Sequence, residues 1–309
     1  GTTIAEQLSA EGHDITIVDS DEAVVQSLAA RLDIMGVTGN GATHTVLKEA
    51  AVEEADLLIA VTESDELNLL CCMVGKKAGA EHTIARGRNP EYNQDISFIK
   101  NDLGLAMTIN PEYAASTEMA RLLRFPSAIE IDTFGRGRVE LLEYKIPDGN
   151  VLKGKSLIDV SRNIKSDVLI CAVERDEEVV IPNGSFVLEE GDIISIVAST
   201  GNARDFFKKV GCNNNGVKDT LIVGGGTIAY YLAKQLIPLG IKVKIIEKEY
   251  PRCEELSAML PEAVIIHGDA TDKDVLLEEG IEKCTSFVSL TGIDEENVFL
   301  SLYAKSISN

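Results

Sequence analysis

The chain has 309 residues, a formal net charge of −21 and no tryptophan. So large an excess of acidic side chains repels phosphate backbones and anionic lipid, which argues against nucleic-acid binding and against direct adsorption to a membrane. The sequence also holds no apolar run of about 18 residues, so a function at a membrane would need a partner that supplies the membrane part.

The first region is typical of an α/β unit. A helical pattern through Leu8 precedes a strand pattern that ends at Asp19, and further strand patterns cover residues 34–38 and 57–61. The segment that begins at Ile84 ends another strand. Residues 111–124 carry an apolar stripe at helical spacing and stop just before Phe125 and Pro126, which predicts a helix there.

The middle region differs from the first in the length and spacing of its strand patterns. Its apolar strand patterns are short and are separated by turn signals at residues 147–149, 182–184 and 190–192, where we expect Gly191 and Asp192 to serve a β-turn rather than an ion site. The strand patterns cover residues 139–146, 168–174, 179–181 and 193–198. They predict a small α+β domain, followed by a linker at residues 211–216.

A glycine motif opens the last region. A strand pattern at residues 220–223 leads into Gly224-Gly225-Gly226-Thr227-Ile228-Ala229 and then into a helical pattern. Strand, Gly-x-Gly-x-x-Gly/Ala and helix form the dinucleotide fingerprint, in which the glycines allow a tight turn and a close approach to a pyrophosphate. The helix N-terminus also favours an anion.

The first and last regions are copies of one unit. An offset of 228 places Asp19 on Glu247, and an offset of 229 places Gly39-Asn40-Gly41 on Gly268-Asp269-Ala270 and Thr62–Asn68 on Thr291–Asn297. Gly1 then falls on Ala229, so the opening strand and two glycines of the first copy are not in this sequence. The second copy stops early, and we expect the chain to be a piece trimmed at both ends.

Acidic residues end the second strand of each copy. Asp19 and Glu247 each lie about 20 residues past the glycine turn, where a carboxylate takes a ribose hydroxyl and disfavours a 2′-phosphate. This favours NAD or an adenine nucleotide over NADP. Other candidates follow later strands, where ligands of open α/β sheets bind: Asn40, Gly41, Thr62, Asn68, Asp269, Ala270, Thr291 and Asn297.

Charged residues near these positions leave alternatives open. Arg86 and Arg88 could pair with phosphate, or with carboxylates in a surface or subunit salt bridge. Asp65-Glu66 and Asp294-Glu295 could serve the site or complement a helix N-terminus. The six cysteines form no C-x-x-C pair, and no histidine has metal-ligand spacing from them, which favours reduced thiols and no metal site.

The succession Val18-Asp19-Ser20, Gly39-Asn40-Gly41-Ala42, Thr62-x-Ser-Asp-Glu-x-Asn68 and Ala85-Arg86-x-Arg88-Asn-Pro-Glu-Tyr92 resembles the RCK/KTN family. The resemblance spans nearly the whole chain and is looser in the second copy. It implies an α/β fold with tandem Rossmann-like (RCK N-type) domains at residues 1–125 and 217–309, and an intervening α+β (RCK C-type) domain at 126–211. Tandem members also carry a second small domain, which this sequence lacks.

The resemblance also implies a function. Such proteins are cytoplasmic regulatory subunits that form a homo-oligomer, a dimer or a tetrameric ring, beneath a TrkH-like membrane potassium transporter, and NAD, NADH, ATP or ADP alters gating. By resemblance, Asp19 and Ser20 lie at the adenosine ribose, Asn40 lies near the adenine, and Gly1 flanks the pyrophosphate. Thr62, Asn68, Arg86 and Arg88 complete the site, and the helix at 111–124 matches the crossover helix that pairs subunits.

Two alternative functions are an NAD-dependent oxidoreductase and a nucleotide sensor of another cation transporter. An NAD-dependent oxidoreductase needs a proton donor or acceptor at the nicotinamide, and only His267, at a strand end, is a candidate. His13 is placed in a turn, His82 in a loop, and His44 opens a helix. The small domain is also too short for a substrate domain, so we expect no enzyme. A nucleotide sensor of another cation transporter differs only in its partner and ligand.

Overall fold

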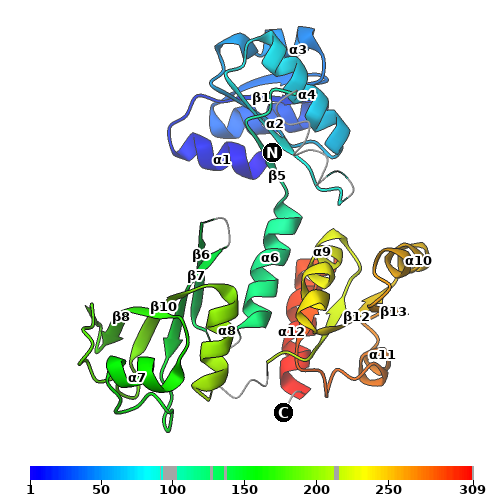
Figure 1. Cartoon of the computed structure of the whole chain (residues 1–309). Coiled ribbons are helices and arrows are strands. Elements are labelled where there is room, and N and C mark those ends of the chain that lie inside the picture. The colour runs from blue at the N-terminus through cyan, green and yellow to red at the C-terminus, as the bar shows by residue number, and fades with distance from the viewer. Residues whose placement is uncertain (91, 93–102, 126–127, 136–137, 212–215, 308–309) are drawn as a thin grey trace. The chain divides into compact units, whose positions relative to one another are not determined.

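The computed structural model describes residues 1–90, 92, 103–125, 128–135, 138–211 and 216–307. The chain divides into two compact units, residues 1–114 and 115–309 (Figure 1). One helix, α6 (Pro111–Arg124), contains the boundary between them.

The first unit is an α/β unit with parallel strands. Strands β1 and β2 pair with each other, and β3, β4 and β5 form a second sheet in that order. Its elements are α1 (Thr2–Ala10), β1 (Thr16–Asp19), α2 (Glu22–Leu32), β2 (Met35–Thr38), α3 (His44–Glu49), η1 (Val52–Glu54), β3 (Leu57–Ala60), α4 (Asp65–Ala78), β4 (His82–Arg86) and β5 (Met107–Ile109).

Local sequence explains where the helices at the sheet ends begin. The Asp21 carboxylate accepts a hydrogen bond from Ala23 N at 2.9 Å and caps α2, and the Ser64 hydroxyl accepts one from Leu67 N at 3.1 Å and caps α4. One face of α4 then buries Cys71 and Cys72 against β3 and β4. Both helices therefore start at the carboxyl ends of strands, where the candidate site residues lie.

The small domain is built on an antiparallel sheet with strand order β6-β7-β10-β8-β9. Its elements are β6 (Glu130–Phe134), β7 (Val139–Lys145), α7 (Leu157–Ile164), β8 (Leu169–Arg175), β9 (Glu178–Val180), β10 (Ile193–Ala198) and α8 (Thr200–Lys209). Alternate residues of β7 and β10 are buried, including Leu142, Ile194 and Ile196, and form one core with Phe206 of α8.

Two carboxylates are buried in this domain, and each is paired. Glu140 accepts hydrogen bonds from Arg124 at 2.5 Å and from the Thr200 hydroxyl at 3.0 Å. The Asp192 carboxylate accepts hydrogen bonds from both Nε and Nη2 of Arg175, at 2.7 and 2.8 Å. A buried charge requires such partners, so Asp192 has the structural role at the turn that its sequence context predicted.

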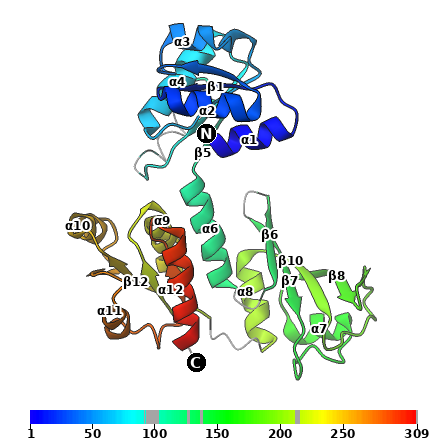
Figure 2. The same cartoon turned by 180° about the vertical axis from the view of Figure 1, so that it is seen from behind.

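The second copy is a doubly wound parallel sheet with strand order β13-β12-β11-β14. Its elements are β11 (Asp219–Val223), α9 (Thr227–Leu236), η2 (Ile237–Leu239), β12 (Lys242–Glu247), α10 (Tyr250–Met259), β13 (Val264–His267), α11 (Lys273–Glu278), β14 (Phe287–Ser289) and α12 (Asp294–Ile307). Figure 2 shows α10 and α11 beyond β12, away from α12.

Helices cover both faces of this sheet, which is why the consecutive residues Leu221, Ile222 and Val223 of β11 are all apolar and buried. Ile222 faces α9 and α10 in one core cluster, whereas Leu221 and Val223 face α11 and α12 in another. Helix α6 also packs against α9 in this unit: Ala120 joins the first cluster, and Gln235 Nε2 donates to the Ser116 hydroxyl at 2.8 Å. The helix expected to pair subunits thus contacts the second copy of its own chain.

The two copies differ in their sheets. By the repeat, β1, β2 and β3 correspond to β12, β13 and β14, and β11 lies between β12 and β14. In the first copy, no strand of the described residues lies between β1 and β3, which explains why its strands form two separate sheets.

The expected helix at residues 111–124 and the strand at 193–198 have the predicted bounds, and the second strand of the last region ends at Glu247 as expected. The structure corrects other expectations. His82 is the first residue of β4 and does not lie in a loop. Strand β9 covers residues 178–180 rather than 179–181, because Glu178 to Val180 pair with β8. Part of the expected linker at 211–216 lies outside the described residues, and the three domain boundaries stay predictions.

Candidate functional site

The glycine turn of the second copy, Gly224–Thr227, joins β11 to α9. Gly224 has φ +91°, and a Cβ there would lie 2.4 Å from the carbonyl oxygen of Leu290, so only glycine fits. A Cβ at Gly226 would meet no atom within 4 Å. Gly226 and Thr227 open α9 without a side-chain cap, so the backbone at this end is accessible to an anion. Ala229 is fully buried beneath it.

Side chains occupy the middle of this turn. Glu247, the last residue of β12, accepts hydrogen bonds from Gly225 N at 2.6 Å and from Glu249 N at 2.7 Å. Arg252 Nε donates to Gly225 O at 2.8 Å. Gly225 is therefore held at its N–H by the last residue of β12 and at its carbonyl by a residue of α10.

An ion pair crosses the ends of β12 and β13. Lys248 Nζ lies 2.8 Å from Asp269 Oδ2, and the other oxygen of Asp269 accepts from Thr271 N and Oγ1. The hydrogen bond from Lys248 is the main reason that the pKa of Asp269 lies far below its ordinary value. Ala270 is part of the core, so its side chain does not face a ligand.

The first copy places Asp19 at the end of β1, on the surface. Asp19 Oδ1 accepts from Asp21 N at 2.9 Å. Ser20 follows it and is exposed, and Asn40 Oδ1 turns back to accept from Ala42 N at 2.9 Å. Gly41 lies above Val18 and Cys71, and Gly1 is the N-cap of α1, beside Val61. The strand ends thus bring Asp19, Ser20 and Asn40 to one edge.

Thr62 and Asn68 form a brace that both copies share. Asn68 is fully buried, and its Oδ1 accepts from Thr62 N at 2.7 Å and from Thr62 Oγ1 at 2.8 Å. Its Nδ2 donates to Thr62 O and to Arg86 O, so it ties the end of β3 to the end of β4. Thr291 and Asn297 repeat the bonds within the pair at 2.8, 2.9 and 3.1 Å. Both asparagines hold the backbone in place.

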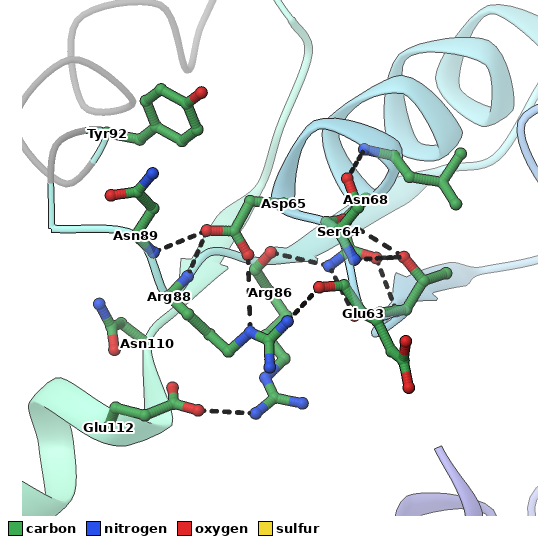
Figure 3. Close-up of polar contacts among 12 residues, drawn as sticks. Glu63, Ser64, Asp65, Asn68, Arg86, Arg88, Asn89, Tyr92, Asn110 and Glu112 are labelled. Atoms are coloured by element: carbon green, nitrogen blue, oxygen red, sulfur yellow. Dashed lines mark hydrogen bonds and ion pairs between the residues drawn. The ribbon is translucent and has the colours of Figure 1, made fainter. Parts of the chain in front are cut away.

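Figure 3 shows the charged cluster beside this brace, where Arg86 and Glu112 approach each other from β4 and α6. Arg86 Nη2 donates to Glu112 Oε1 at 2.7 Å. Asp65, which is buried, accepts from the backbone N–H groups of Arg88 and Asn89, both at 2.7 Å. The Arg88 side chain bonds to Glu63 O. Both arginines expected at phosphate therefore have partners within the first unit.

Asp65 and Asp294 differ although they match in the repeat. Asp65 bonds to the chain segment after β4, whereas Asp294 is exposed in the first turn of α12. Glu66 is also exposed and accepts from Tyr92 Oη at 2.9 Å. For the first pair, the contacts favour a role in fixing the loop at the strand end.

Other reactive groups are few in the described part of the chain. It contains no group of three histidine, cysteine or acidic side chains placed to hold a metal ion. His267 Nε2 contacts Lys248 O at 3.1 Å, and its ring stacks edge-on against Tyr250. Burial raises the pKa of the Cys72 thiol to about 12. Cys212 lies outside the described residues.

Sequence reasoning missed three residues at these sites: Lys248, Arg252 and Glu112. The first two follow Glu247 within five positions, and a count of basic residues after the strand could have found them. Glu112 lies 26 residues after Arg86, in the first turn of a helix, so no sequence pattern near Arg86 pointed to it. In the residues that the structure describes, no helix is long and apolar enough to cross a membrane.

The fold and the strand-end residues define a class: tandem Rossmann-like units with an intervening antiparallel α+β domain. The TrkA-N domain model matches residues 1–111 and 220–309, and the TrkA-C domain model matches residues 141–211. The chain belongs to the TrkA family, which confirms both the RCK/KTN resemblance and the predicted fold class.

Relatives with this name match nearly the whole chain. The "Trk system potassium uptake protein TrkA homolog" of Archaeoglobus fulgidus is 36% identical over 298 residues, which cover 96% of this chain and 67% of the relative. The TrkA protein of Halomonas elongata is 36% identical over 308 residues, which cover 99% and 67%. The chain thus spans about two thirds of the length of these relatives.

Solved structures support the fold. The "GsuK Channel" has a TM-score of 0.70 at 18% identity, and the "GsuK channel bound to NAD" has a TM-score of 0.68 at 18% identity. Each match covers 99% of this chain and 53% of the channel chain. At this identity the likeness concerns the fold alone.

Proposed function

We propose that this protein is a cytoplasmic regulatory subunit of a potassium uptake system, which binds a nucleotide and couples binding to the gating of a membrane partner. The observation that carries the proposal is the TrkA-N match over both copies, each of which has a carboxylate, Asp19 or Glu247, at the end of its second strand. That position suits a ribose hydroxyl.

The ligand is NAD or NADH, with ATP or ADP as the alternative. GsuK structures carry NAD and ADP by their titles, which supports this class of ligand. In the first copy, Asp19 and Ser20 would hold the ribose, Asn40 would lie near the adenine, and Gly1 would flank the pyrophosphate. In the second copy, Gly224–Thr227 would take the pyrophosphate and Glu247 the ribose, with Asp269 beside it.

Phosphate binding by Arg86 and Arg88 would require an exchange of partners. Arg86 now bonds to Glu112 in the first turn of α6, and Arg88 lies 3.8 Å from Asp65. Arg86 Nε and Glu112 Oε2 are buried and lack hydrogen bonds within the described residues, so the pair leaves bonding capacity unused. A phosphate that draws Arg86 away from Glu112 would alter α6, and binding would then favour one shape of the assembly. Thr62 and Asn68 keep the strand ends in place.

The partner is a TrkH-like potassium transporter, and the protein assembles as a homo-oligomer, a dimer or a tetrameric ring. The names of the relatives and the likeness to a gating ring support this assignment. A nucleotide sensor of another cation transporter is the near alternative. The excess of acidic groups argues against nucleic acid as a partner.

We propose no catalysis. His267 is the one histidine at a strand end of the second copy, and it already contacts Lys248 O and Tyr250. A proton donor at a nicotinamide would have to leave those contacts. An NAD-dependent oxidoreductase therefore remains an alternative that a turnover assay decides.

The test is calorimetric titration with NAD, NADH, ATP, ADP and NADP, alongside an assay of NADH oxidation and NAD reduction. Asp19→Ala should raise the dissociation constant of the first site about tenfold or more, because it removes hydrogen bonds to a charged group. Asp14→Ala is the matched control, since Asp14 is exposed before the opposite end of β1. Equal affinity in Asp19→Ala contradicts the site, and turnover of NADH contradicts the regulatory function.

A further inference from the structure

The two copies match residue by residue at the strand ends but differ in charge and in side-chain length. Asp19 corresponds to Glu247, Ser20 to Lys248, and Asn40 to Asp269. At these three positions each copy provides a reference for the other, whereas the glycine turn with Gly225 has its counterpart outside this sequence.

The first difference is the reach of the acidic residue. In both copies the carboxylate accepts from the backbone N–H two residues later, Asp21 N at 2.9 Å or Glu249 N at 2.7 Å. Glu247 has one more methylene group, and its second oxygen reaches Gly225 N at 2.6 Å. The carboxylate that should accept from a ribose is thus already bridging two N–H donors, one of them in the glycine turn.

The second difference is an ion pair. Lys248 and Asp269 meet at 2.8 Å between the ends of β12 and β13, where the first copy has the neutral residues Ser20 and Asn40. Arg252 adds a bond to Gly225 O, and the first copy has Val24 in its place. The phosphate end of the site stays open, because a Cβ at Gly226 would meet nothing within 4 Å.

We propose that the second copy is a self-closed nucleotide site, in which the Glu247 carboxylate and the Lys248–Asp269 ion pair take the place of the nucleoside. The inference rests on the proposed function and adds a regulation to it. A nucleotide must displace these internal partners before its ribose can bind, so the second copy binds more weakly than the same scaffold with the residues of the first copy.

The proposal names the residues that set the affinity. Glu247→Asp restores the side chain of the first copy, which keeps a carboxylate for the ribose but withdraws it from Gly225 N. We expect nucleotide binding at the second copy to become about tenfold tighter, which corresponds to about 1.4 kcal/mol. Lys248→Ser combined with Asp269→Asn removes the ion pair from an exposed position, where such pairs are weak, and should tighten binding by a smaller factor.

Hydrogen exchange followed by mass spectrometry separates the copies, because peptides near Asp19 and peptides covering residues 219–236 report on different sites. NADH and ATP are titrated into the protein and its variants, and the midpoint of protection is read for each copy. Without ligand, the Gly225 amide should exchange faster in Glu247→Asp. Glu254→Asp is the control, since the same change is made at an exposed position of α10.

A tighter midpoint at the second copy in Glu247→Asp, with Glu254→Asp unchanged, supports the proposal. If the midpoint in Glu247→Asp is unchanged or weaker while the first copy is protected, the self-closed site is wrong and the proposed function stands. If neither copy is protected by any nucleotide, both are wrong. The Lys248→Ser, Asp269→Asn double variant decides the case if Glu247→Asp fails to fold.

Discussion

Removal of the Asn68 side chain should destabilise the first unit strongly. Asn68 is fully buried, and its amide bonds to Thr62 N, Thr62 Oγ1, Thr62 O and Arg86 O. In Asn68→Ala, the Thr62 hydroxyl keeps its contact with Ser64 O, but the Thr62 N–H, the Thr62 carbonyl and the Arg86 carbonyl lose their side-chain partner. The substitution thus unties β3 from β4 at the edge where the candidate site lies.

The expected cost follows from those orphaned groups. A backbone group left without a partner in a partly buried place costs about 1–3 kcal/mol, so the three groups together cost about 3 kcal/mol at the low end of that range. For a unit of this size, each kcal/mol lowers the melting temperature by about 4 °C. We therefore expect Asn68→Ala to lower the melting temperature of the first unit by about 12 °C.

Asn297→Ala is the matched comparison within the same chain. Asn297 makes the same bonds to Thr291, but it is only half-buried, and within the described residues its side chain makes no hydrogen bond to a second strand. Water can replace a partner at such a position, so the cost should be about 1 kcal/mol or less. The two substitutions remove the same atoms from the same motif in different surroundings.

Differential scanning calorimetry measures the two transitions, and hydrogen exchange assigns each transition to a unit. A large loss for Asn68→Ala beside a small loss for Asn297→Ala supports the brace. Equal losses, or a loss below about 1 kcal/mol for Asn68→Ala, would show that burial and the bond to Arg86 O do not set the stability.

Two further predictions concern the turn and the small domain. Gly224→Ala should destabilise the second copy, because its Cβ would clash with Leu290 O. Gly226→Ala should leave the melting temperature unchanged but reduce the protection from hydrogen exchange that a nucleotide gives. Unchanged protection would contradict the open phosphate end. Burial raises the pKa of Asp192, but Arg175 outweighs it and holds that pKa below the ordinary value, so its stabilisation is present above about pH 4 and is lost on acidification. The melting temperatures of Asp192→Asn and the parent should differ at pH 7, and the difference should shrink as the pH falls below about 4. A difference that stays constant on acidification would contradict the ion pair.

Elements with a strong local signal were predictable from the sequence. The apolar stripe and the following Pro126 gave α6 its bounds, and alternating burial gave β10 its bounds. Strand β6 was missed because Glu130 and Asp132 interrupt its apolar pattern. The shift in β9 has a similar cause: Ile181 reads as a strand residue but is 87% exposed and lies beyond the pairing with β8.

The partners of the site residues were beyond prediction because they depend on distances across the fold. The sequence places Asp19 and Glu247 at equivalent positions, but only the structure shows that one additional methylene reaches Gly225 N. It likewise places Arg86 at a strand end without locating Glu112, which α6 brings back to β4. The sequence identifies the candidate polar groups, and the packing of the fold decides which of them already have hydrogen-bond partners within the protein.

The duplicated unit separates residues that hold the scaffold from residues that face a ligand. The Thr–Asn brace recurs with nearly the same distances in both copies, 2.7 and 2.8 Å to the threonine N–H and 2.8 and 2.9 Å to its hydroxyl. Beside the shared carboxylate, the strand-end residues differ: Ser20 and Asn40 of the first copy are neutral, whereas Lys248 and Asp269 of the second are charged. Two sites with one scaffold and unequal affinities would fill at different nucleotide concentrations, so a single assembly could respond over a wider range than one site permits.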